Sequence, residues 1–166
     1  MRGDEFEALY EEHGAPLLAF LHYRTGDMEL ARDLHSDTFE RVLKARRRFD
    51  PRKASQKTWI YTIALNALRD HARRRSAEGR ALERLAAGSR PGGWDEGGPI
   101  DALDTRAMLL RGLWTLADEE REALALRYGA DLSLREIANV TGTRETTVKG
   151  RIYNGLAKLR EQLDEG

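Results

Sequence analysis

The stretch SLREIANVTGT, Ser133–Thr143, decides the fold. Ser133 followed three residues later by Glu136 forms a capping box, which predicts a short helix over Leu134–Val140. Gly142 can adopt the positive φ that a tight turn after this helix requires. The side expected to face inward carries Ile137 and Ala138, and the small Ala138 lets a second helix pack closely. The pattern predicts a helix-turn-helix; the alternative is an ordinary helical hairpin within a bundle.

A second helix is expected to follow, capped by Thr143 and running from Arg144 to about Leu163. Its buried stripe is predicted to hold Val148, Ile152, Leu156 and Leu159. Lys149 and Tyr153 then lie together on the opposite side. Arg151 and Lys158 are placed where DNA phosphates could be met. This is the arrangement in which the second helix enters the major groove of DNA.

The stretch TWIYTIALNALRDHARRR, 58–75, forms an earlier helix with two different faces. One face carries a predicted core stripe of Ile60, Ile63, Ala64 and Ala67. The other carries Trp59, Thr62, Asn66, Arg69 and Arg73. An aromatic ring, a hydroxyl, an amide and two guanidinium groups on one face can stack on bases and hold phosphates. The alternative is that Trp59 belongs to the core and the arginines are only solvated.

Breaks in the helical pattern divide the rest of the chain. Gly14-Ala15-Pro16 predicts the start of a new helix at Pro16, Asp27 is expected to cap the next helix, and Phe49-Asp50-Pro51 to end it. A long helix is predicted from Gln56 to about Ala86. Five glycines and two prolines over 88–99 indicate a flexible linker. We therefore predict an all-α protein with two small helical domains, 1–86 and 102–166, joined by a flexible linker over 87–101.

Charge is segregated along a chain whose formal net charge is zero. Residues 1–40 contain three arginines and ten acidic residues, whereas residues 41–84 contain fourteen Lys and Arg and four acidic residues. An acidic block followed by a basic block suggests two partners, one of them a polyanion. The alternative is a solvated helical surface whose charges segregate by chance.

Several classes of protein are disfavoured. The chain has no cysteine, so disulfides and thiolate metal sites are excluded. No signal peptide and no apolar run of membrane-spanning length are found, so we expect a cytoplasmic protein. Asp33, His35 and Asp37 do not converge on one side of a helix, so we expect no metal site. No nucleophile with a base and no phosphate-binding loop is present. We expect no cofactor and no enzymatic activity.

Together, the motifs resemble a known family. The earlier motifs resemble region two of extracytoplasmic-function sigma factors. They are, in order, Asp33-Leu34 with Thr38-Phe39, then Phe49-Asp50-Pro51, then Trp59–Ala64 with Asn66 and the arginine run. The later motifs resemble region four: Leu124 with Leu126–Tyr128, Ser133 with Glu136–Ala138, and Thr147–Arg151. The resemblance covers nearly the whole chain, in the same order.

The resemblance implies a factor that binds core RNA polymerase and directs promoter-specific transcription initiation. Region two would read and melt the minus-ten element with Ala54, Ser55, Gln56, Trp59, Thr62, Asn66, Arg69 and Arg73. Region four would read the minus-thirty-five element with Arg144, Thr146, Thr147, Lys149, Gly150, Arg151, Tyr153 and Asn154. The clamp helices of the largest polymerase subunit would bind Asp33, Asp37 and Glu40, and the flap of the second-largest subunit is a further implied partner. Family members are commonly held by an anti-sigma factor, and the sequence leaves open whether this chain has one.

The chain departs from the family pattern at four positions. Arg32 stands where an acid is usual and Ser36 where Gln is usual. Ala54 and Gln56 stand where Gly and an aromatic residue are frequent. The alternative function is a stand-alone helix-turn-helix regulator that does not need polymerase. The promoter sequence, the regulon and the inducing signal cannot be inferred from the sequence.

Overall fold

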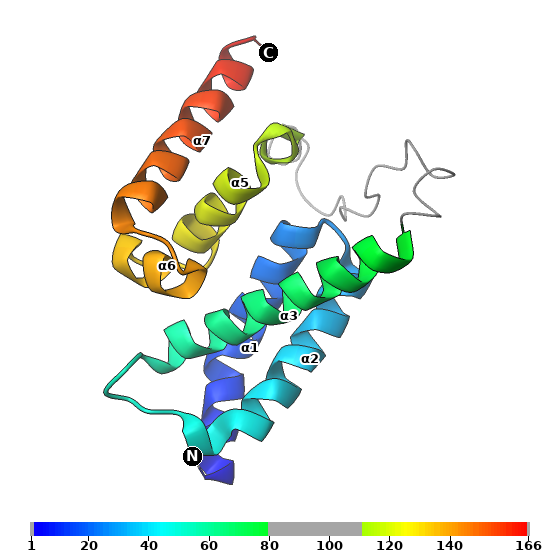
Figure 1. Cartoon of the computed structure of the whole chain (residues 1–166), viewed down its shortest axis with the longest axis vertical. Coiled ribbons are helices and arrows are strands. Elements are labelled where there is room, and N and C mark those ends of the chain that lie inside the picture. Colours follow the sequence, from blue (N-terminus) through cyan, green and yellow to red (C-terminus); the bar gives the residue numbers. More distant parts are fainter. Residues whose placement is uncertain (1, 80–110, 166) are drawn as a thin grey trace. The chain divides into compact units, whose positions relative to one another are not determined.

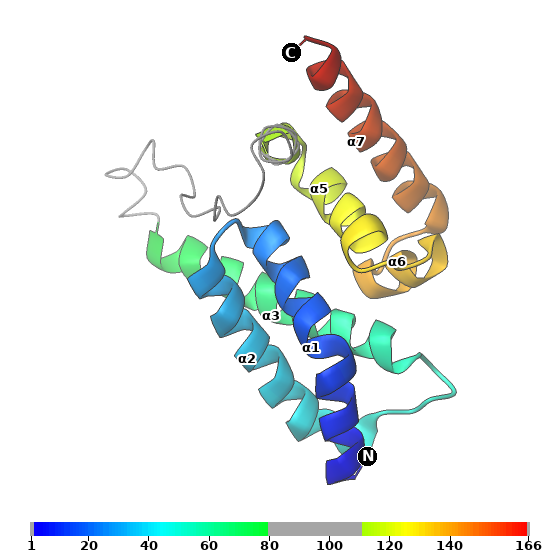
Figure 2. The ribbon, with the colours of Figure 1, turned by 180° about the vertical axis from the view of Figure 1, so that it is seen from behind.

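A computed structural model describes residues 2–79 and 111–165 (Figures 1 and 2). Helices are the only regular elements in these two ranges, which confirms the all-α prediction. The chain divides into two compact units, Met1–Gly93 and Trp94–Gly166, and each is described by itself. The expected linker, 87–101, lies outside the described residues, so the exact domain bounds stay a prediction.

The first unit begins with α1, Gly3–Thr25, which runs unbroken through Pro16. The predicted break at Gly14-Ala15-Pro16 is therefore wrong. A proline inside a helix removes one hydrogen bond and crowds the carbonyl four residues earlier. Here Pro16 is exposed, while buried residues before and after it, Leu9 and Leu17 among them, hold both halves of the helix in the core. Burial in the tertiary structure thus overrides the local signal.

The second helix, α2, spans Met28–Ala45 and begins as predicted at Asp27. The Asp27 carboxylate accepts hydrogen bonds from the backbone N–H groups of Glu29 and Leu30, at 3.0 and 3.3 Å. Ala31, Leu34, Thr38 and Val42, which recur every three or four residues, are buried. A short 3₁₀ turn, η1, Arg46–Arg48, ends the helix before Phe49.

The third helix, α3, Gln56–Gly79, packs on α2 and α1, which lie side by side beneath it (Figure 1). Ile60, Ala64 and Ala67 are buried as predicted, and Ile63 is half-buried. Tyr61 and Leu65 are also buried, and the Tyr61 ring meets Phe20 of α1 edge-on, with centroids 5.3 Å apart. Burial raises the pKa of Tyr61 to about 12. The core side of α3 is therefore wider than the predicted stripe, and the predicted end near Ala86 lies outside the described residues.

The second unit contains a helical segment over 111–115, α5 (Asp118–Leu124), a π-helical turn η2 (Ala125–Gly129), α6 (Leu134–Thr141) and α7 (Glu145–Glu165). The helical segments are interrupted at 116–117 and at 130–133. The core of the unit is built from residues of α5, η2, α6 and α7 and of the connections between helices: Leu116, Leu124, Leu126, Leu132, Ile137, Val148 and Ile152. Figure 2 shows α6 lying at one end of α7, with α5 beside α7.

The first helix of the helix-turn-helix, α6, has the predicted capping box and the predicted glycine at its end. The Ser133 hydroxyl accepts a hydrogen bond from the Glu136 N–H at 3.1 Å, and the Glu136 carboxylate accepts one from the Ser133 N–H at 3.0 Å. Gly142 ends α6 with a φ of 67°. The helix α7 begins at Glu145, one residue later than expected, and the Thr143 hydroxyl pairs with the Thr141 hydroxyl at 2.8 Å.

The buried stripe of α7 differs from the prediction at one position. Val148 and Ile152 are buried and Leu159 is half-buried, but Leu156 is 39% exposed. Gly155 is buried in its place, and a Cβ built on Gly155 would lie 2.9 Å from Leu124 Cδ1 of α5. Because α5 approaches the backbone of α7 here, the contact requires the absence of a side chain.

Replacing each of two glycines of α7 with alanine should therefore change the stability of the second unit in opposite directions. Gly155→Ala should lower the free energy of unfolding of the second unit by about 1–2 kcal/mol, since the new methyl group collides with Leu124. Gly150→Ala should raise it by about 0.5–1 kcal/mol, because a Cβ there meets nothing within 4 Å and alanine favours helix. Thermal unfolding of both variants measures the difference. Equal effects of the two substitutions would contradict the packing described for α5 and α7.

Candidate nucleic-acid interface

The first half of α7 exposes most of the residues predicted to read duplex DNA. Val148 and Ile152 fix the orientation of the helix by packing into the core. The outward side holds Arg144, Thr146, Thr147, Lys149, Tyr153 and Asn154, and Gly150 and Arg151 are half-buried. The Tyr153 ring is 74% exposed, so an apolar group is available to a partner. Cations, hydroxyl groups and an exposed aromatic ring thus gather on one helix that α6 supports.

Lys158 has a different role from the phosphate contact that its sequence position suggested. Its ammonium group lies 2.6 Å from the carboxylate of Glu120 on α5. Glu120 is 7% exposed, and the hydrogen bond from Lys158 holds the pKa of this carboxyl below its usual value. Lys158 therefore joins α7 to α5. The partner lies 38 residues earlier in the chain, so the helical pattern of α7 held no sign of it.

Trp59 of α3 fits neither predicted alternative completely, because it is neither fully exposed nor fully part of the core. The Trp59 ring is half-buried and packs against Phe49, with ring centroids 4.9 Å apart. Thr62 is half-buried and its hydroxyl donates to the Thr58 carbonyl at 2.8 Å, whereas Asn66 is exposed. Arg69 and Arg73 are also exposed. The polar end of this face is therefore exposed, while Trp59 contributes partly to the core.

The loop before α3 is held by hydrogen bonds. Ser55 acts as the cap of α3, because its hydroxyl accepts from the Thr58 N–H at 3.1 Å and donates to the Thr58 hydroxyl at 3.0 Å. Ala54 is half-buried, and Ser55 and Gln56 are exposed. Ala54 and Ser55 therefore lie just before α3, and Gln56 is the first residue of the helix that also carries Asn66.

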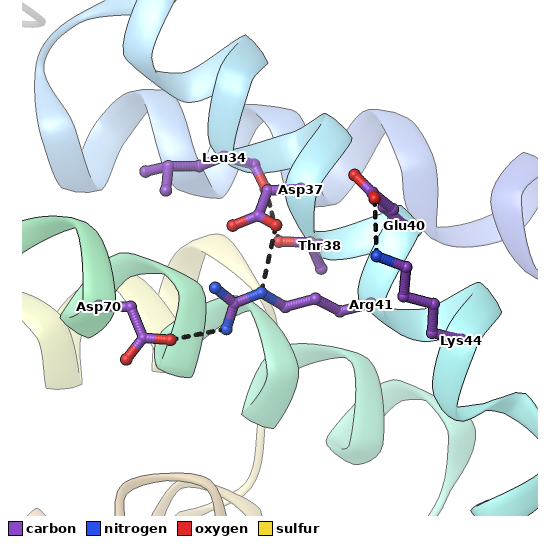
Figure 3. A network of polar contacts seen from close by, with 7 residues as sticks. All are labelled: Leu34, Asp37, Thr38, Glu40, Arg41, Lys44 and Asp70. Atoms are coloured by element: carbon purple, nitrogen blue, oxygen red, sulfur yellow. Dashed lines mark hydrogen bonds and ion pairs between the residues drawn. The ribbon is translucent and has the colours of Figure 1, made fainter.

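The acidic residues of α2 are paired to different degrees. Asp33 is exposed, and no ion pair to it is found in the described part of the chain. Glu40 pairs with Lys44 at 2.9 Å, and Asp37 with Arg41 at 3.2 Å (Figure 3). Asp33 is thus the member of the predicted set with the most accessible charge.

Arg41 is a functional candidate that the sequence reasoning missed. Its Nη1 atom lies 2.8 Å from the Asp70 carboxylate on α3 (Figure 3). Asp70 also pairs with Arg73. The hydrogen bonds from Arg41 and then Arg73 hold the pKa of Asp70 below its ordinary range, and the Asp70 contact raises the pKa of Arg41. The spacing of Asp37 and Arg41 signals their pairing. Asp70 lies 29 residues after Arg41, so this contact could be found only from the folded structure.

The structure adds two observations on other classes of site. Within residues 2–79 and 111–165, no three His, Asp or Glu side chains come close enough to hold a metal ion. His35 turns away from Asp33 and Asp37, and its Nε2 atom lies 2.8 Å from the Gly14 carbonyl of α1. None of the described helices is long and apolar enough to cross a bilayer.

Two helical units, one with a capped helix-turn-helix and one with an exposed Asn/Arg helix face, define a DNA-binding protein of the transcriptional class. The family model for sigma-70 region 2 matches residues 9–78, and the model for sigma-70 region 4 matches residues 112–161. The chain belongs to the extracytoplasmic-function sigma factors, which bind core RNA polymerase and direct promoter-specific transcription initiation.

Related sequences agree with this assignment. The chain is 32% identical to the RNA polymerase sigma factor CarQ of Myxococcus xanthus, over 98% of this chain and 91% of that protein. It is 29% identical to the sigma factor SigL of Mycobacterium tuberculosis, over 95% of this chain and 88% of that protein. It is 28% identical to the sigma factor BldN of Streptomyces coelicolor, over 98% of this chain, but spans only 61% of the length of BldN.

Solved structures show the same fold. The sigma factor RpoE of Bartonella quintana, in complex with the anti-sigma factor NepR, matches with a TM-score of 0.79 and 23% identity, over 96% of this chain and 97% of that one. CnrH, in complex with the cytosolic domain of CnrY, matches with a TM-score of 0.70 and 26% identity, over 99% and 90% of the two chains.

Proposed function

We propose that this sigma factor reads the minus-thirty-five element with α7 and the minus-ten element with α3 and the loop before it. The observation that carries the proposal is the outward face of α7, where Lys149 and Tyr153 are exposed one turn apart behind a fully capped α6. A helix presented in this way can enter the major groove and contact base edges. On the first unit, Asn66, Arg69 and Arg73 are exposed along α3 and supply groups for a DNA strand.

The proposal assigns polymerase binding to α2. Asp33, Asp37 and Glu40 lie along one side of this helix and offer negative charge to a basic surface on the clamp helices of the largest subunit. The flap of the second-largest subunit is the proposed partner of the second unit. An anti-sigma factor is a further proposed partner, because the relative CnrH is in complex with the cytosolic domain of a second protein. We further propose that the protein acts in the cytoplasm, together with core RNA polymerase, and that it catalyses no reaction itself.

The direct test is run-off transcription with purified core polymerase. A genomic fragment library is transcribed with and without the protein, and the start sites that depend on it are mapped. A stoichiometric complex with core polymerase and a common pair of upstream elements are expected. Duplex binding without polymerase, and no dependent start sites, would instead support a stand-alone regulator.

Substitution Asn66→Ala should reduce open-complex formation about two- to ten-fold, because it removes one exposed amide that can hydrogen-bond to the minus-ten strand. Permanganate reactivity of unpaired thymines in the bubble measures the loss. Affinity for core polymerase, titrated in parallel, should remain at the wild-type value since Asn66 lies outside the α2 face. Normal bubble reactivity in the variant would remove Asn66 from the proposed site.

A further inference from the structure

Four side chains of alternating charge link the two proposed surfaces of the first unit. Asp37 and Arg41 belong to α2, and Asp70 and Arg73 belong to α3. The contacts run in order, from Asp37 to Arg41, from Arg41 to Asp70, and from Asp70 to Arg73. Figure 3 shows the first two of these contacts. One end of this charge relay, Asp37, lies on the proposed polymerase face, and the other end, Arg73, lies on the proposed DNA face.

The two inner members of the relay are each shared between two partners. Arg41 divides its guanidinium group, with Nε on Asp37 at 3.2 Å and Nη1 on Asp70 at 2.8 Å. Asp70 likewise uses Oδ2 for Arg41 and Oδ1 for Arg73. A shared group binds each partner less firmly than it would bind either partner alone, because its donors or acceptors are divided. A change at one end of the relay can therefore alter the strength of the contact at the other end.

The two inner side chains of the relay are more buried than Arg73 at its end. The side chains of Arg41 and Asp70 are 29% and 30% exposed, whereas Arg73 is 77% exposed. The inner pair lies where α2 and α3 pack, so solvent screens it less than it screens the outer contacts. In the free protein, Asp70 competes with any phosphate for Arg73.

We propose that Arg41 is a positioning residue that couples polymerase binding on α2 to DNA binding on α3. The proposal rests on the function proposed above for the two faces. A basic polymerase surface that binds Asp37 removes it from Arg41. The Arg41 guanidinium then turns wholly to Asp70, and the better-neutralised Asp70 releases Arg73 to a DNA phosphate. The free sigma factor thus holds back one DNA-binding cation until polymerase is bound.

The test is a cycle of substitutions in the full chain, with binding to a fluorescein-labelled single-stranded DNA of random sequence measured at low salt without polymerase. Asp37→Ala, which imitates the removal of Asp37 from Arg41, should tighten DNA binding about two- to five-fold. The same substitution in an Arg41→Gln background should have only the effect of removing one negative charge. Asp33→Ala is the matched control for that effect, because Asp33 lies one turn earlier on α2 and outside the relay.

The outcomes separate the relay from the function on which it rests. A gain from Asp37→Ala that exceeds the gain from Asp33→Ala and disappears in the Arg41→Gln background supports the relay. The relay is overturned if Asp37→Ala raises DNA affinity equally with and without Arg41. It is also overturned if Asp33→Ala and Asp37→Ala raise DNA affinity equally. Arg73→Gln in the wild-type background tests the proposed DNA face separately, since it should weaken binding whether or not the relay exists. Arg41→Lys provides a second background if Arg41→Gln unfolds, because a single ammonium lacks the planar fork that spans two carboxylates.

Discussion

Reversing Asp33 and Asp37 together to Lys should lower the affinity of the protein for core RNA polymerase by about ten- to a hundred-fold. Both carboxylates lie on one side of α2, where a basic partner surface would meet two new positive charges. Like charges brought together at an interface are costly, and the lost attraction adds to this penalty. Binding should also become less sensitive to salt, because fewer opposite charges remain to be screened. Titration of labelled protein with core polymerase at several salt concentrations measures both effects.

The structure separates the contributions of the two acids. Asp33 is exposed, whereas Asp37 already pairs with Arg41, so the single reversal Asp33→Lys should account for most of the loss without disturbing Arg41. Glu11→Lys is a matched control, because Glu11 is an exposed acid on α1 and outside the proposed face. Unchanged affinity in the double reversal, or an equal loss in the Glu11 variant, would show that polymerase binds elsewhere.

The second large effect is expected at the minus-thirty-five element. Lys149→Ala should cost about 1–3 kcal/mol at the preferred sequence and relax the choice at one base pair, because the exposed ammonium group can donate to guanine O6 and N7. Arg151→Ala should instead weaken all promoters about equally and reduce the slope of binding against salt by about one, as expected for a phosphate contact. The two residues are two positions apart on α7. Comparing their variants therefore distinguishes a contact to a base from a contact to the DNA backbone.

A randomised minus-thirty-five library, transcribed by each variant with core polymerase, measures the base preference directly. Arg160→Ala is the control, because Arg160 is an exposed cation on the same helix, three turns beyond Lys149. Its base preference should match the wild type. A Lys149 variant that keeps the wild-type preference at every base pair would remove Lys149 from the proposed reading set.

Features that depend on near neighbours in the chain could be predicted from the amino-acid sequence. Asp27, the Ser133–Glu136 capping box and Gly142 mark helix ends that are present in the structure, because caps and turns act within three or four residues. The two residues of α6 predicted to face inward, Ile137 and Ala138, are likewise buried. The order of the motifs was sufficient to recognise the family and both regions.

Features that depend on contacts between residues far apart in the chain could not be predicted, because packing between helices sets them. Pro16 stays inside α1 because both halves of the helix are packed in the core. Gly155 replaces Leu156 at the α7 interface because α5 comes too close for a side chain. Lys158 forms an ion pair with Glu120, and Arg41 forms one with Asp70 as well as with Asp37. Packing brings these opposite charges together across helices. Periodicity predicts which way a side chain points, but packing between helices determines what it meets.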